Sequence, residues 1–316
     1  MVSLGLVSWL CTKVDWRALG LRIQGMSVVW LWPVAVLSPL CLVLLTFRWS
    51  LFLRSRGSKF RFFDLLPILW GGQFCNTFLP GAVGGDVYKA VIIARMSEGA
   101  KAESAATVVL DRFCALVTLG ALGAAGLWEE RTVLGEVFAQ GVNIPRGIAV
   151  GGGVAVATAI LTTFAFFAIP RLKPSRLAIA AILVRIWSTL LAGLTEWKVM
   201  AVAVFVSLLI HLSNFAIFYC LGRGLHFELT FGQVMLIMPM VILIAMLPIT
   251  INGHGLREVL LTAYFLWANP GRLIGLGAAE AAIAISFLYV ANDLVWNLPG
   301  GLLMVLRKPK TSIDEH

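Results

Sequence analysis

Long apolar runs separated by short polar connections dominate the chain, and this pattern predicts membrane helices. The runs 27–47 and 147–169 are uncharged, and the run 199–221 holds one ionisable residue, His211. Each run has about the 20 residues that a helix needs to cross the hydrocarbon core of a bilayer. Further candidate spans are 104–127, 229–251 and 273–306. We therefore predict an all-α, polytopic membrane protein with about six to eight transmembrane helices.

The charges between the runs predict which side of the membrane each connection faces. The connection 48–61 carries only basic charges, and the stretch 171–176 and the tail 307–310 are also basic, whereas 128–146 is rich in acid. Basic loops are retained on the cytoplasmic side. We therefore place these basic segments, including the C-terminus, in the cytoplasm and 128–146 outside. The run 104–127 then leads outward, so the connection 86–103 before it, which carries Lys89, Arg95 and Lys101, is cytoplasmic as well.

This orientation requires a re-entrant segment. Since 48–61 and 86–103 lie on the same side, residues 64–85 must enter the membrane and return. Irregular backbone at membrane depth is tolerated only inside protein or beside a water-filled cavity. The same orientation predicts that 229–268 enters and returns from the outer side.

Two similar motifs end the broken segments. The first is LPGAVGGDVYK at 79–89, and the second is LPITINGHGLRE at 247–258. Each follows an apolar run with Leu-Pro, then glycines, then an acid near a base. Paired interruptions in two halves of a chain are typical of transporter binding sites and suggest an inverted repeat. The alternative interpretation is that both motifs are ordinary loops at the membrane edge.

The two motifs predict the organisation of the chain. We expect one domain, 1–316, with halves at about 27–169 and 199–306. The segment 177–195 carries Arg185 and fits a helix that lies in the membrane interface between the halves. The segment 1–12 is apolar but short, and whether it spans the membrane is open.

A broken helix exposes backbone N–H groups and a positive dipole end, and both attract anions. Arginine and lysine near these ends would grip a phosphate. Asp111 and Arg112 add to the site because ionisable residues inside a span usually face a partner or a cavity. We predict that Asp111 holds Lys89 or Arg257; alternatively, both Asp111 and Arg112 lie at the interface. The predicted substrate-binding residues are Asn76, Pro80, Gly81, Gly84, Gly85, Asp86, Lys89, Asp111, Arg112, Asn252, Gly253, His254, Gly255, Arg257 and Glu258.

Other polar residues in the spans have simpler expected roles. His211 and Asn214 share a helix face, and we expect an interhelical hydrogen bond there. Glu280 and Asp293 are candidate buried carboxylates that could relay protons, or they lie at the interface.

Composition agrees with a membrane protein. Hydrophobic residues make up 59% and charged residues 13% of the chain, against about 25% charged in soluble proteins. The net charge of +9 fits cytoplasmic loops at anionic lipid better than nucleic acid. The five scattered cysteines give neither a disulfide framework nor metal spacing. We expect no cofactor, no metal and no catalytic motif.

Several motifs carry a family likeness. These are KVDW at 13–16, FRW at 47–49, NTFLPGAVGGDVYKA at 76–90, VLDR at 109–112, INGHGLREVLL at 251–261 and LPGGLL at 298–303. With these motifs in this order, the chain resembles the flippase-like transmembrane family, also described as the lysylphosphatidylglycerol synthase transmembrane region or uncharacterised protein family 0104. Two departures are Lys89, where many members have arginine, and YVAND at 289–293, which lacks an expected basic residue.

The resemblance implies an inner-membrane protein that handles lipids. We expect translocation of an anionic or glycosylated lipid across the cytoplasmic membrane, with membrane lipids as partners. One alternative is a membrane enzyme or accessory factor in cell-envelope glycolipid or polyprenyl-lipid synthesis, with Asp86 or Glu258 as base. Another is a structural partner with no transport of its own.

Overall fold

The computed structural model describes residues 16–78, 84–97, 101–129, 188, 193, 195–246, 253–268 and 277–306. All regular structure within these residues is helical. The expected segments 1–12 and 147–169, and nearly all of 177–195, lie outside the described residues. The elements are α2 (Trp16–Gln24), the 3-10 helix η1 (Val28–Trp30), α3 (Leu31–Ser55), α4 (Phe62–Phe78), α5 (Gly84–Met96), α6 (Lys101–Glu129), α10 (Trp197–Gly224), α11 (Phe231–Met246), α12 (Leu256–Ala268) and α13 (Ala278–Leu306).

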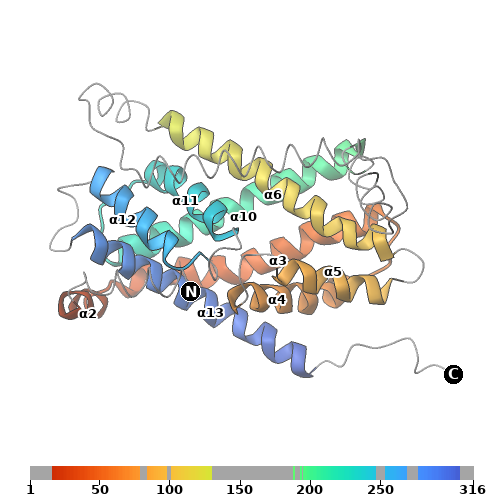
Figure 1. The fold of residues 1–316 in the computed structure, drawn as a ribbon, viewed down its shortest axis with the longest axis horizontal. Coiled ribbons are helices and arrows are strands. Elements are labelled where there is room, and N and C mark those ends of the chain that lie inside the picture. Colours follow the sequence, from red (N-terminus) through yellow and green to blue (C-terminus); the bar gives the residue numbers. More distant parts are fainter. Residues whose placement is uncertain are drawn as a thin grey trace, which may run out of the picture.

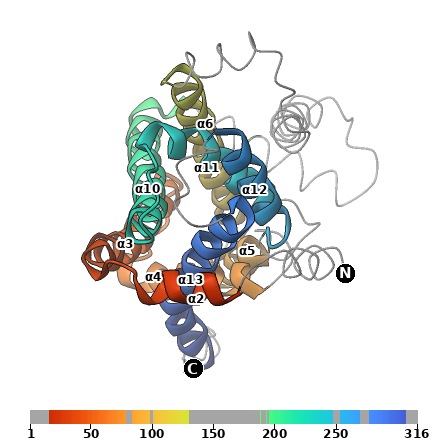
Figure 2. The same ribbon diagram turned by 90° about the vertical axis from the view of Figure 1, so that its left-hand side faces the viewer.

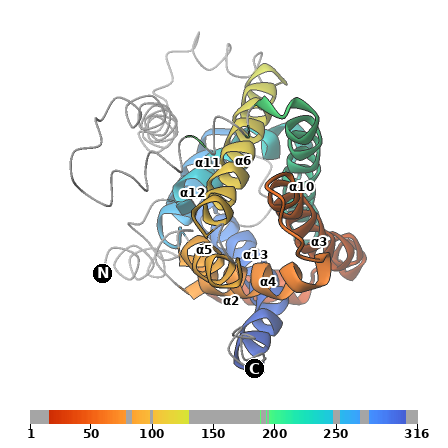
Figure 3. The ribbon, with the colours of Figure 1, turned by 90° about the vertical axis from the view of Figure 1, so that its right-hand side faces the viewer.

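Four long helices run along the longest axis of the molecule (Figure 1). They contain the stretches Val28–Ser55, Ala106–Glu129, Trp197–Gly224 and Ala279–Leu306, each long and apolar enough to cross a membrane. Seen from either end, the helices are grouped around this axis (Figures 2 and 3). The chain is therefore a multi-pass membrane protein, with four such spans in the described part.

Two helical hairpins occupy opposite ends of this bundle. In Figure 1, α4 and α5 lie in the right half, and α11 and α12 lie in the left half. In the first hairpin, α4 ends at Phe78 and α5 begins at Gly84. In the second, α11 ends at Met246 and α12 begins at Leu256. In each hairpin the chain runs inward and then returns to the end from which it came. This path agrees with the enter-and-return course expected from the loop charges.

The structure corrects two boundaries in the first half. The segment 86–103 is not a loop, because α5 continues to Met96 and forms the returning arm of the hairpin. Arg48 is not in a connection either, because α3 continues to Ser55 and buries Arg48. In both cases a charge that was read as a sign of a loop is neutralised by a partner inside the bundle. Lys89 pairs with Asp86, and Arg48 pairs with Asp111.

Two main apolar clusters hold the described helices together. One joins α3, α4 and α5 through Trp49, Leu65 and Ile93. The larger one involves α10 to α13 and includes Phe218 and Phe265. Burial of such side chains and dispersion contacts hold helices together where lipid supplies no hydrophobic driving force between them. Cys41, Cys75, Cys114 and Cys220 are free thiols, as expected.

Glycines allow the hairpin arms and their neighbours to approach closely. A Cβ on Gly85 of α5 would lie 2.0 Å from the carbonyl oxygen of Gly72 on α4. On α13, a Cβ on Gly300 would lie 2.4 Å from the carbonyl oxygen of Trp70. The Trp70 indole N–H donates to the carbonyl oxygen of Trp296 at 2.5 Å, which ties α4 to α13. The close packing at these glycines leaves no room for a side chain.

We predict that Gly85→Ala destabilises the protein by about 1–3 kcal/mol, because the added methyl group overpacks the interface between α4 and α5. The matched control is Gly120→Ala on α6, where a Cβ meets nothing within 4 Å. Thermal unfolding of both variants in detergent measures the difference. Equal melting temperatures for the two variants would contradict the packing described here.

Candidate functional site

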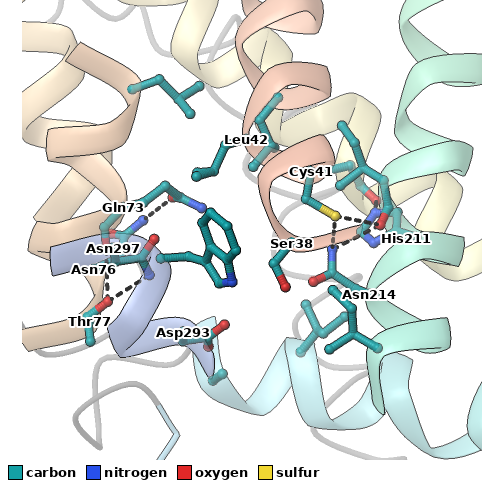
Figure 4. Close-up of a pocket in the computed structure, with 18 of the residues that line it drawn as sticks. Ser38, Cys41, Leu42, Gln73, Asn76, Thr77, His211, Asn214, Asp293 and Asn297 are labelled. Atoms are coloured by element: carbon teal, nitrogen blue, oxygen red, sulfur yellow. Dashed lines mark hydrogen bonds between the residues drawn. The ribbon is translucent and has the colours of Figure 1, made fainter. Parts of the chain in front are cut away.

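A cavity of about 270 Å³ lies inside the bundle. Its lining comes from α3, α4, α5 and α6 in the first half and from α10, α11, α12 and α13 in the second. Figure 4 shows Gln73, Asn76, Thr77 and Asn297 on one side of this pocket and Ser38, Cys41, Asn214 and His211 on the other. Its polar lining consists of Ser38, Arg48, Gln73, Asn76, Thr77, Lys89, Asp111, Arg112, His211, Asn214, Arg257, Tyr289, Asn292, Asp293 and Asn297.

Several predicted site residues meet in this cavity. Residues from both motifs and from α6 line it, namely Asn76, Lys89, Asp111, Arg112 and Arg257. Other predicted residues lie directly behind this lining, in contact with it: Gly85, Asp86, His254 and Glu258. Gly255 in turn contacts Glu258. Pro80, Gly81 and Asn252 lie outside the described residues. That any of these residues binds substrate remains a prediction.

Asp86 forms the charged centre of the first hairpin. Lys89, one turn later on α5, places its Nζ 2.8 Å from Asp86 Oδ1. Arg112 of α6 donates to the other carboxylate oxygen. Lys89 is buried, and its Nζ lies 5.8 Å from the centre of the Trp49 ring. One carboxylate therefore holds two cations at the cavity, and it fixes α5 against α6.

Asn76 joins the two arms of the first hairpin. Its Oδ1 accepts a hydrogen bond of 2.7 Å from the backbone N–H of Gly85, at the start of α5. The first N–H groups of a helix have no partner within the helix, and a side-chain oxygen satisfies one of them here. The Asn76 Nδ2 donates to Gln73 Oε1 at 3.2 Å. Both ends of this carboxamide are thus used within the protein, although Asn76 was predicted to bind substrate.

The second hairpin repeats the combination of glycines, acid and base. Gly253 and Gly255 have φ values of 76° and 90°, a conformation that glycine adopts without strain. The Gly255 N–H donates to Glu258 Oε2 at 2.5 Å, so that Glu258 caps the start of α12. The other oxygen of Glu258 accepts from the Arg257 guanidinium at 3.2 Å and from the Ser286 hydroxyl on α13. Glu258 therefore has a structural role in forming the turn.

Arg257 links α12 to α13 while it lines the cavity. Its Nε donates to Ser286 Oγ at 2.9 Å, and its Nη2 lies 3.1 Å from His254 Nδ1. Its guanidinium carbon lies 5.9 Å from the centre of the Tyr289 ring. The guanidinium is therefore held in a fixed position, as a binding group on a rigid element should be.

The partner of Asp111 differs from the prediction. Asp111 was expected to hold Lys89 or Arg257, but it accepts from Arg48 Nε of α3 at 2.6 Å. Arg48 Nη1 also donates to Ser207 of α10 at 2.9 Å. The helix does not begin after these residues either, as the interfacial alternative supposed, because α6 begins at Lys101, more than two turns earlier. The pair instead joins three helices inside the bundle.

His211 and Asn214 make the interhelical contacts expected from their shared face. His211 Nε2 lies 2.9 Å from the carbonyl oxygen of Ala115 on α6, and since a carbonyl only accepts, this nitrogen carries the hydrogen. The Tyr289 hydroxyl of α13 donates to Asn214 Oδ1 at 3.4 Å. These bonds connect α10 to α6 and α13 around the cavity.

The inner face of α13 was missed by sequence reasoning. Asn292, Asp293, Trp296 and Asn297 line the cavity together with Tyr289. Only Asp293 had drawn attention, as an ionisable residue inside a span. Asparagines give no charge signal, but their spacing with Tyr289 follows the helical period of one face. The sequence signal that could have predicted this face is the recurrence of polar residues every three to four positions within an apolar run.

We predict that Asp111→Asn costs about 3–5 kcal/mol of stability, because it leaves the buried charge of Arg48 without a carboxylate. The double variant Arg48→Met with Asp111→Leu should recover most of this loss, since it removes both charges. Melting temperatures of the single and double variants in detergent form the test. A double variant less stable than both Arg48→Met alone and Asp111→Leu alone would refute this view of the pair.

Comparison with known families agrees with the fold and the cavity. The family described as the lysylphosphatidylglycerol synthase TM region matches residues 1–295. That stretch includes both hairpins and all of the cavity lining except Trp296 and Asn297. No curated protein matches the chain. Because the match extends over nearly the whole sequence, the chain belongs to the lysylphosphatidylglycerol synthase TM region family.

Proposed function

We propose that this protein translocates an anionic or glycosylated lipid across the cytoplasmic membrane and holds the headgroup in the cavity between its two hairpins. One observation carries the proposal. Lys89 and Arg112 from one half of the chain and Arg257 from the other half line a single cavity. Ionisable residues at membrane depth mark substrate pathways in membrane proteins. The membership of the family supports a role in lipid handling.

The charge pattern supports an anionic group as ligand. Lys89 and Arg112 both contact the carboxylate of Asp86, so at the first hairpin two positive charges stand against the one negative charge of Asp86. The Nη1 of Arg257 makes none of the hydrogen bonds that hold this side chain within the described residues, and it remains available as a donor. A guanidinium binds phosphate oxygens well because its donors match their geometry.

The starts of α5 and α12 add to the attraction. Both helices begin at the inner tips of their hairpins, next to residues of the cavity lining. The N-terminal end of a helix carries about half of a positive elementary charge. In transporters, such interrupted helices direct their positive ends at anionic substrate groups near the middle of the membrane.

Hairpins from opposite ends offer a route for alternating access. We infer that outward movement of one hairpin would connect the cavity to one leaflet, and movement of the other hairpin to the second leaflet. Basic residues occur where α3 ends, before α4 begins and where α5 ends, namely Arg54, Lys59, Arg61 and Arg95. These helix ends lie in the right half of Figure 1, where α13 also finishes. The positive-inside rule assigns that end, with the C-terminus, to the cytoplasm.

The contacts of the two acids favour transport over the enzymatic alternative. A general base needs a carboxylate that can take a proton from substrate. Asp86 is bound to Lys89 and Arg112, and Glu258 is bound to Gly255, Arg257 and Ser286. These bonds engage both oxygens of each carboxylate with groups of the protein itself.

We predict that Arg257→Gln slows lipid translocation at least about tenfold, since it removes a charge-assisted bond to the headgroup phosphate. The assay measures exchange of fluorescent phosphatidylglycerol between the leaflets of proteoliposomes. The matched control is Arg223→Gln, at the end of α10 and outside the cavity lining, where the guanidinium lies over the Trp30 ring. Control vesicles should keep the rate of the unmodified protein.

Asp86→Ala tests the same site from the first hairpin. Loss of this carboxylate frees Lys89 and Arg112, so we expect an altered rate together with stronger retention of the anionic lipid. If both Arg257→Gln and Asp86→Ala translocate the lipid at the unmodified rate, these residues have no part in the mechanism. Absence of any protein-dependent exchange would reject the proposed function itself.

A further inference from the structure

We propose that the inner face of α13, together with Gln73 of α4, binds a neutral polyhydroxyl unit of the headgroup, such as one sugar or cyclitol ring. This proposal rests on the proposed function and names its substrate class. The groups involved are Gln73, Asp293, Trp296 and Asn297, which line one cavity with the cations described above. The polyol subsite formed by these four residues lies beside the phosphate-binding cations.

A chain of hydrogen bonds fixes the direction of the Gln73 carboxamide. The backbone N–H of Gly85 can only donate, so the atom of Asn76 that accepts it is the carbonyl oxygen. The other end of Asn76 is then its amide nitrogen, which donates to Gln73 Oε1. The Nε2 of Gln73 makes no hydrogen bond within the described residues. Gln73 therefore presents a donor to the cavity.

A second chain fixes the direction of Asn297. The Thr77 hydroxyl gives its only hydrogen to the backbone carbonyl of Gln73 at 3.0 Å. The oxygen of Thr77 can then only accept, and the Nδ2 of Asn297 donates to it at 3.1 Å. This leaves the carbonyl oxygen of Asn297 as an acceptor without a partner among the described residues. Figure 4 shows Asn297 beside Thr77 and Asn76 at the pocket wall.

Asp293 adds a second acceptor on the same helix face. It lies one turn before Asn297 on α13 and lines the same cavity. Within the described part of the chain, it has no ion-pair partner within 4.0 Å and no hydrogen bond. The polyol subsite thus combines a donor at Gln73 with acceptors at Asp293 and Asn297.

This mixture of donors and acceptors selects a hydroxyl-bearing ligand. An ammonium group only donates and would leave Gln73 unsatisfied, whereas a phosphate only accepts and would leave Asn297 and Asp293 unsatisfied. A hydroxyl does both, and neighbouring hydroxyls on one ring can satisfy all three residues. Unpaired buried polar groups are costly, so a site of this kind discriminates strongly between such ligands.

The size and shape of the cavity limit the ligand to one small unit. The volume of about 270 Å³ lies just below the range of about 300–1,000 Å³ that is usual for pockets that hold drug-sized ligands. Trp296 contributes a flat apolar surface to the same lining, against which the C–H face of a ring can pack.

Direct binding tests the proposal independently of transport. The full chain in detergent is titrated by native mass spectrometry with phosphatidylinositol, lysyl-phosphatidylglycerol and phosphatidylmethanol, whose headgroup has no hydroxyl, all with the same acyl chains. We expect the inositol lipid to bind about tenfold more tightly than the lysyl lipid, from one to two additional hydrogen bonds. Asn297→Leu should remove this preference and leave binding of phosphatidylmethanol within about twofold. Gln24→Leu, at the exposed end of α2, is the matched control and should change neither.

Each result decides between the two proposals. Equal binding of the three lipids, or an equal loss for all three in Asn297→Leu, overturns the polyol subsite. The same three lipids, with fluorescent acyl chains, are then assayed for exchange in proteoliposomes. Selective binding without any exchange upholds the polyol subsite and rejects translocation. Exchange without selectivity upholds translocation and rejects the polyol subsite.

Discussion

A charge inside a bilayer has no water to pair with, and this constraint shapes the interior of the bundle. Each buried basic residue that the structure describes in the cavity lining has a carboxylate at close range. Arg48 has Asp111, Lys89 and Arg112 share Asp86, and Arg257 has Glu258. All these pairs connect elements or fix the start of a helix, so the need for neutralisation also determines which helices lie together.

The same constraint explains which parts of the fold the sequence predicted. Opposite entry of the two hairpins followed from loop charges and from glycine and proline at the ends of apolar runs. Boundaries were harder because a basic residue looks the same in a loop and in a buried pair. Arg48 and Lys89 were assigned to cytoplasmic connections, and only the positions of Asp111 and Asp86 in space show otherwise.

The site was partly predicted for a related reason. Lys89, Arg112 and Arg257 were chosen because charges in apolar runs stand out, and the structure brings them to one cavity. Asn76 and Glu258 were expected to bind substrate, but they cap α5 and α12. Sequence alone cannot separate a side chain that binds a ligand from one that satisfies a backbone N–H nearby. Asn297 was missed because an uncharged amide in an apolar helix lowers the mean hydropathy only slightly.

The attachments of α13 have a mechanical consequence. Its first part is bound to α12 through Ser286, and its second part is bound to α4 through Trp296 and the contact of Gly300 with Trp70. If the distance between the two hairpins changes, the part of α13 between these attachments must therefore bend or shift. Pro299 lacks the N–H that would bond the carbonyl of Val295, so the helix is least stiff close to the second attachment. We therefore expect a displacement of one hairpin to be transmitted to the other through α13.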